Sequence, residues 1–172
     1  TTSGSYSYTT TNSNGCDSIA TLNLTINNST SSTNNQTVCY GGSYSINGNT
    51  YTSTGSYTDV LTASNGCDST VTTNLTVLSQ LTVSIQAVGG TSACSGSSVS
   101  LSIVGWINPN NTYQWNDGSG AISGATSSTY STSSSGTYTL TITDINGCVA
   151  VSNSIGVTIL TPTTPTGLST TA

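Results

Sequence analysis

Five cysteines and five aspartates are the residues of this chain best suited to chemistry, and the chain contains no Lys, Arg or His. Nucleophilic catalysis by Ser or Cys needs a neighbouring base, usually His and sometimes Lys. A glycosidase needs two well-placed carboxylates, whereas these aspartates are scattered and there is no glutamate. We therefore expect no enzymatic activity and no catalytic residue. Without cationic side chains the protein also lacks the phosphate contacts on which nucleic-acid binding depends.

Metal and cofactor binding are not predicted either. The cysteines do not form C-x2-C pairs and no histidine can join them, which argues against zinc. Asp117 in "NDGSG" and Asp144 in "TDING" could each offer an oxygen to calcium, but neither has a neighbouring carboxylate. A role in closing a turn is favoured for both aspartates.

Three cysteines instead belong to a repeated pattern. The pattern G-[ST]-Y-x7-N-G-C ends at Cys16, Cys67 and Cys148, and residues 1–26 share fifteen identical positions with residues 52–77. Runs such as Ser56–Thr62 alternate in the manner of a strand, and Asn-Gly supplies the positive φ angles of a tight hairpin turn. Each copy is predicted to be a hairpin whose cysteine begins the return strand, with its sulfur on the apolar side.

Cysteines upstream of the hairpins supply candidate disulfide partners. We predict bonds between Cys39 and Cys67 and between Cys94 and Cys148, each contributing about 3–4 kcal/mol by limiting the unfolded chain. Cys16 is left unpaired in this scheme, on the interpretation that the chain starts inside a unit whose first half is missing.

The strand and repeat patterns predict an all-β protein built of tandem, disulfide-stapled β modules, the third of which resembles an immunoglobulin-like β-sandwich. Trp115, shortly before an Ile-Ser-Gly-Ala-Thr stretch and a Gly-Thr-Tyr strand, is typical of such a sandwich and is expected to pack in the core or between domains. The predicted divisions are the C-terminal half of a truncated repeat, a short disulfide-bridged repeat, an immunoglobulin-like sandwich, and a linker that leads into a fibronectin III-like module, at residues 1–26, 27–79, 80–160 and 161–172.

Together, "VCYGGSYSINGNTYTSTGSYTDVLTASNGCDSTVTTNLTV" and the unit around Trp115 resemble repeats of very large surface proteins of the Bacteroidota. Such proteins are tandem-repeat adhesins and filaments exported by type IX secretion, including gliding adhesins and prey-catching appendages. The resemblance implies an elongated array of tandem, disulfide-stapled, immunoglobulin-like β-sandwich modules, an extracellular, cell-surface location and no chemistry within the repeat. It also implies O-glycosylation at Ser18 and Ser69, which each follow an aspartate; the alternative is that these residues complete a turn.

The predicted function is a structural or adhesive segment of a stalk or filament that attaches the cell to surfaces or to other cells. The expected partners are identical chains, cell-surface glycans or other cells. No membrane insertion is expected, because no run approaches the roughly 20 apolar residues of a spanning helix. The alternative is a carbohydrate-binding β-sandwich module of a secreted protein, for which Trp106, beside the probable loop "INPNN", is the candidate contact to a glycan or partner.

Overall fold

The computed structural model describes residues 2–105 and 108–163. These residues form strands, turns and irregular segments and no helix, so the predicted all-β class is confirmed. None of the described residues therefore belongs to a helix that could cross a membrane. The chain folds into two compact units, Thr1–Val77 and Leu78–Ala172.

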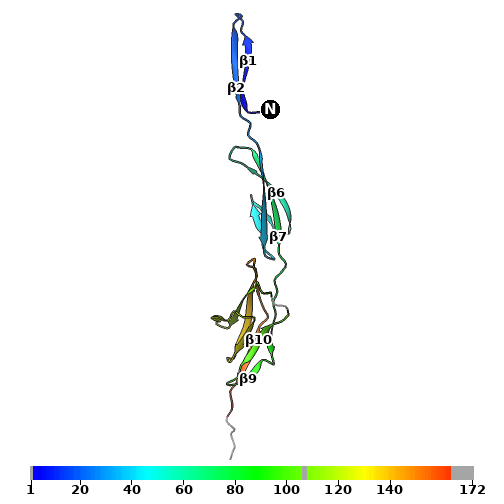
Figure 1. Cartoon of the computed structure of the whole chain (residues 1–172), viewed down its shortest axis with the longest axis vertical. Helices are drawn as coiled ribbons and strands as arrows, with labels where there is room; N and C mark the ends of the chain where they lie inside the picture. The colour runs from blue at the N-terminus through cyan, green and yellow to red at the C-terminus, as the bar shows by residue number, and fades with distance from the viewer. Residues whose placement is uncertain (1, 106–107, 164–172) are drawn as a thin grey trace, which may run out of the picture. The chain divides into compact units, whose positions relative to one another are not determined.

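The first unit contains three separate sheets. One is an antiparallel hairpin of β1 and β2, another has the strand order β3-β7-β6 with β3 parallel to β7, and the third is the short hairpin β4-β5 (Figure 1). The strands are β1 (Gly4–Thr11), β2 (Asp17–Leu24), β3 (Thr30–Val38), β4 (Tyr44–Ile46), β5 (Asn49–Tyr51), β6 (Gly55–Thr62) and β7 (Asp68–Val77).

The second unit is an immunoglobulin-like sandwich of two sheets. One has the order β13-β10-β8, and the other has the order β12-β11-β14-β16-β9 with β15 also paired to β14. As in the first unit, one pair of strands is parallel, here β9 and β16. The strands are β8 (Ile85–Val88), β9 (Ser92–Cys94), β10 (Val99–Ile103), β11 (Thr112–Asp117), β12 (Gly120–Ala121), β13 (Thr129–Thr132), β14 (Gly136–Thr143), β15 (Val149–Val151) and β16 (Ile155–Leu160).

Trp115 lies in the core of this sandwich, as its sequence context predicts. It is fully buried in one cluster with Leu101 of β10 and Leu140 of β14, and its indole Nε1 donates a hydrogen bond of 2.9 Å to the carbonyl of Ser127. An antibody domain packs its core tryptophan against an intersheet disulfide. Here the indole shares its cluster with aliphatic side chains from both sheets and stacks on the ring of Tyr130 at 5.8 Å, so apolar burial stabilises the core.

The repeated tyrosine fixes the start of each hairpin in the same way. The hydroxyl groups of Tyr6, Tyr57 and Tyr138 each donate to the carbonyl four residues earlier, at 2.6, 2.8 and 3.0 Å. The tyrosine ring lies over the glycine of the same motif, since a Cβ on Gly55 would stand 3.2 Å from the ring of Tyr57. The G-[ST]-Y motif is therefore a local brace that needs a residue without a side chain beneath the ring.

The turn that carries each cysteine differs from the predicted two-residue Asn-Gly turn. Only its glycine has a positive φ, 81° at Gly66, and Gly66 N–H donates to the carbonyl of Ala63 while Ala63 N–H donates to the carbonyl of Cys67. The cysteine thus closes a longer turn and stands before β7 begins, which corrects the prediction that it starts the return strand. A two-residue turn occurs instead at Asn47-Gly48, where both φ angles are positive.

Candidate functional site

The bonding of the cysteines differs from the predicted pairs. Cys39 and Cys148 are disulfide-bonded, whereas Cys67 and Cys94 carry free thiols, as does the exposed Cys16. The predicted bonds Cys39–Cys67 and Cys94–Cys148 are therefore not formed. In both cases the reason is the parallel pairing of two strands.

In the first unit, β3 and β7 run side by side in the same direction, from Thr30 opposite Ser69 to Val38 opposite Val77. Cys67 precedes β7 and Cys39 follows β3, so the two cysteines lie at opposite ends of the sheet. Nine paired residues at about 3.3 Å each separate them by roughly 30 Å. A disulfide needs Cα atoms within about 7 Å.

The second unit repeats this arrangement. Cys94 lies opposite Leu160 at the end of the parallel pair β9 and β16. Cys148 closes the turn at the other end of β14, where Thr143 pairs with Val149. Because β14 is eight residues long, roughly 27 Å separates the two ends.

Each complete sheet therefore carries one cysteine at each of its two ends. We call Cys39 and Cys94 the end cysteines, because they follow the parallel strand, and Cys16, Cys67 and Cys148 the turn cysteines. The end cysteines share their local structure as well: the carbonyl of Cys39 accepts from Gly42 N–H and that of Cys94 from Ser97 N–H. The end cysteine and the turn cysteine of one sheet lie too far apart to form a disulfide with each other. Each sulfur can therefore bond only to a group that lies beyond its own end of the sheet.

A polar cluster that the sequence did not reveal lies between β6 and the β4-β5 hairpin. Asp59 is 2% exposed, and its Oδ1 accepts hydrogen bonds from Asn49 Nδ2 at 2.6 Å and from Tyr51 Oη at 2.8 Å. The hydrogen bond to Asp59 raises the pKa of Tyr51 above its usual value of about 10, and burial and the carboxylate charge add to this. The Tyr51 ring stacks on Tyr57 at 3.9 Å. These hydrogen bonds hold the β4-β5 hairpin against β6. The signal in the sequence that could have revealed the cluster is an aspartate two residues after the motif tyrosine.

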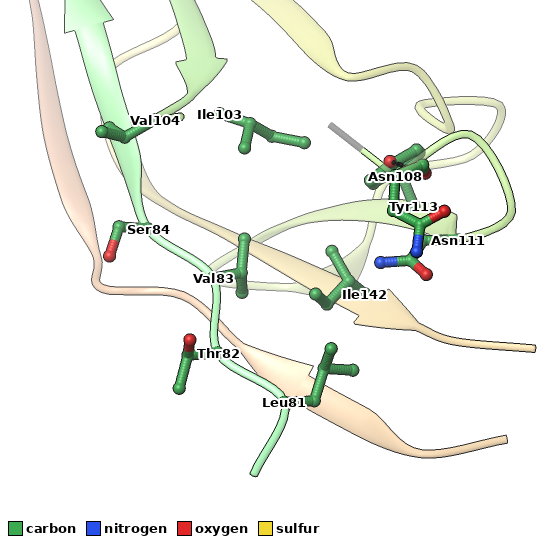
Figure 2. A pocket seen from close by; sticks show the side chains of 10 residues that line it. All are labelled: Leu81, Thr82, Val83, Ser84, Ile103, Val104, Asn108, Asn111, Tyr113 and Ile142. Atoms are coloured by element: carbon green, nitrogen blue, oxygen red, sulfur yellow. Dashed lines mark hydrogen bonds between the residues drawn. The ribbon is translucent and has the colours of Figure 1, made fainter. Parts of the chain in front are cut away.

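One pocket of about 350 Å³ lies in the second unit, a volume that suits a small molecule. Figure 2 shows aliphatic side chains along most of it and the polar groups of Asn108, Asn111 and Tyr113 gathered on one side. The Tyr113 hydroxyl donates to the carbonyl of Asn108 at 2.7 Å, whereas the buried Oδ1 of Asn111 has no hydrogen-bond partner. The lining residues are Leu81, Thr82, Val83, Ser84, Ile103, Val104, Asn108, Asn111, Tyr113 and Ile142.

The two aspartates considered for calcium have turn roles. Asp117 Oδ1 accepts from Ser119 N–H at 2.8 Å, and Asp144 Oδ1 accepts from the N–H groups of Asn146 and Cys148. Within residues 2–105 and 108–163, no three Cys, Asp, Glu or His side chains gather in a way that could hold a metal ion.

The remaining predicted sites differ in accessibility. Ser18 is exposed on β2, whereas the Ser69 hydroxyl is half-buried on β7 and shares a 2.9 Å hydrogen bond with Thr30. Trp106 lies outside the described residues, and so do residues 164–172, which contain the fibronectin-like "PTGLS". Glycosylation of Ser18 and Ser69 stays a prediction.

No protein-family model matches the chain, and neither does any curated protein. Among solved structures, murine CEACAM1b is similar with 23% identity and a TM-score of 0.40, over 62% of this chain and 59% of that one. Extracellular domains 3–5 of Drosophila OTK match with 19% identity and a TM-score of 0.38, over 69% of this chain and 46% of that one. The glucan-utilisation protein SGBP-B of Bacteroides ovatus, in complex with a mixed-linkage heptasaccharide, matches with 17% identity and a TM-score of 0.27, over 94% and 55%.

Proposed function

We propose that this chain is a structural and adhesive segment of a secreted cell-surface protein, in which repeated β modules form a stalk or filament and carry no catalytic activity. The observation that carries the proposal is the placement of one cysteine at each end of a sheet. Sulfurs so placed can link a module only to what lies beyond it. Links of that kind suit a chain of modules that must resist pulling.

Further features of the molecule support this role. The bonded state of Cys39 and Cys148 supports an extracellular location, since disulfides persist in oxidising compartments. The chain has no Lys or Arg, so trypsin-like proteases find no cleavage site outside the cell. The repeat pattern itself suggests the tandem surface proteins of the Bacteroidota and their type IX export. Identical chains, glycans or other cells are the partners proposed for such a segment.

Imaging of the native producing cells tests the proposal. Antibodies raised against this chain should label fibres or stalks at the cell surface. Labelling confined to the cell interior, or a labelled protein with no extended form, would contradict the proposal.

A carbohydrate-binding module is the second candidate, and the pocket of the second unit favours it. The buried Oδ1 of Asn111 lacks a hydrogen-bond donor, and a sugar hydroxyl in the pocket could supply one. Calorimetric titration with soluble glycans tests this role. Binding that Asn111→Ala removes and Asn110→Ala preserves would favour it, because Asn110 does not line the pocket. Absence of binding across glucans, mannans and chitin oligosaccharides would leave the structural role alone.

A further inference from the structure

The hairpin β1-β2 repeats the β6-β7 part of the sheet that follows it in sequence. An offset of 51 residues places β1 on β6 and β2 on β7, and the hydrogen bonds follow the same offset. Ser3 Oγ accepts from Ile26 N–H at 2.8 Å just as Thr54 Oγ1 accepts from Val77 N–H at 2.8 Å. β7 has a second neighbour, the parallel strand β3, whereas β2 pairs only with β1 within the described residues.

The side chains on one face of this hairpin show the consequence. Tyr8 and Leu22 are 71% and 60% exposed, and at the corresponding positions of the complete sheet Asp59 and Thr73 are 2% and 0% exposed. In the complete sheet β3 pairs with the edge of β7, and β4-β5 contributes the Tyr51 ring and hydroxyl that contact Tyr57 and Asp59 on this face. The first unit therefore shows within itself which kind of segment covers such a hairpin.

We propose that the free edge of β2 is a strand-acceptor site for a segment of the β3–β5 type, a Ser/Thr/Asn-rich strand that ends in a cysteine and continues into a tyrosine-bearing hairpin. The segment adds in parallel to β2, in the register that β3 adopts on β7. Main-chain hydrogen bonds along the strand supply the affinity, as in other cases of strand addition.

The proposed register brings two cysteines together. Val38 of β3 lies opposite Val77, which corresponds to Ile26, so the end cysteine of an added strand would lie beside Asn27. The free thiol of Cys67 is already there, with its Sγ 3.3 Å from the carbonyl oxygen of Asn27. The side-chain amide of Asn27 also donates to the carbonyl of Asn65, which holds the turn of Cys67 against this segment.

Cys67 is thus the turn cysteine placed to bond with the end cysteine of the added strand. With a disulfide oxidant such as oxidised glutathione, the end cysteine first forms a mixed disulfide and one glutathione thiol is released. The Cys67 thiolate then attacks the end-cysteine sulfur, the bond to glutathione breaks, and a second glutathione thiol leaves. Two cysteine thiols are oxidised and one oxidised glutathione is reduced to two thiols.

The test extends the full chain with a second copy of residues 29–51 placed directly before Thr1. Thr52 corresponds to Thr1 in the offset, so the extension joins the hairpin with the same spacing as in the complete sheet. In a glutathione buffer, peptide mapping should show the added cysteine bonded to Cys67. Hydrogen exchange of the β2 amides should slow by about 100-fold or more, because their free edge is now covered.

Matched variants separate strand addition from unselective sulfur chemistry. Replacing the added cysteine by Ser should abolish the bond and keep the slowed exchange of β2, whereas Cys94→Ser should leave both results unchanged. An extension of scrambled sequence that keeps the cysteine position should give neither result. The proposal is overturned if β2 exchanges equally fast with and without the extension, or if the added cysteine distributes among Cys16, Cys67 and Cys94. The strand-acceptor proposal depends on the geometry of the repeat and not on whether the protein attaches the cell to surfaces. This experiment can therefore reject it without rejecting the proposed function.

Discussion

The hairpins β1-β2 and β6-β7 share a sequence pattern, the tyrosine brace and the glycine-closed turn. In both, a Ser or Thr hydroxyl also accepts a hydrogen bond from a backbone N–H at or just after the end of the return strand. They differ in what surrounds them. β7 is flanked on both sides, whereas β2 has one neighbour in the described chain. The hairpin geometry is thus set by local residues, while burial is set by strands that come from elsewhere in the sequence. A third copy, β14 with β15 and β16, keeps the brace and turn inside a full sandwich.

Truncating one buried and one exposed leucine should give the largest difference between the two hairpins. Leu75 of β7 is 2% exposed, and Leu75→Ala should destabilise the sheet β3-β7-β6 by about 2–5 kcal/mol. Leu22 of β2 is 60% exposed, and Leu22→Ala should cost less than about 0.5 kcal/mol. Urea unfolding followed by tyrosine fluorescence measures both values. Similar losses in the two variants would show that an unseen neighbour already covers β2.

Adding one methyl group beneath the motif tyrosine should give a smaller difference. In Gly55→Ala the new Cβ would stand 3.2 Å from the Tyr57 ring, so the ring must shift from its stack on Tyr51. We expect a loss of about 1 kcal/mol, the overpacking cost less the gain from replacing a strand glycine. Gly4→Ala places its Cβ at 3.7 Å from Tyr6, an ordinary contact, and should be neutral or slightly stabilising. Thermal melts of the two variants provide the comparison, and an equal loss would contradict it.

Alkaline pH should weaken the contact between the β4-β5 hairpin and β6, and this is the smallest of the three effects. The hydrogen bond to Asp59 raises the pKa of Tyr51 in the folded state, so the folded state favours the neutral phenol. That stability is fully present below the unfolded pKa of about 10 and is lost as pH rises through the higher folded value. The unfolding midpoint of the sheet β3-β7-β6 should fall above about pH 10, and Tyr51→Phe should flatten this dependence. An unchanged slope in the variant would remove Tyr51 from the explanation.

The repeat sequence predicted the hairpins well because the information they need is local. Alternating residues predicted β6 and β14. The constant spacing between the motif tyrosine and the cysteine corresponds to one strand, which runs from the tyrosine brace at its start to the turn that the cysteine closes. The core position of Trp115 followed from its neighbours in the same way, and it is fully buried. The turn type was wrong because Asn-Gly also fits a longer turn in which the glycine alone takes a positive φ.

Disulfide pairing could not be predicted because it depends on strand direction. An upstream cysteine followed by a hairpin gives no sign that β3 lies parallel to β7, and it is this pairing that puts Cys39 and Cys67 at opposite ends of the sheet. The Asp59 cluster and the pocket lined by Asn111 were likewise invisible, since each joins residues from separate strands and loops.

The sequence by itself determined that this protein is all-β, that one hairpin recurs in it, and that its side chains lack the bases and cations of most catalytic sites. Those properties follow from side-chain chemistry and from contacts between residues a few positions apart. The tertiary structure alone decided where each sulfur lies, which copy of the hairpin is covered and which carries a free edge. Those properties depend on pairing between distant strands, whose direction and register are set by the packing of the whole sheet.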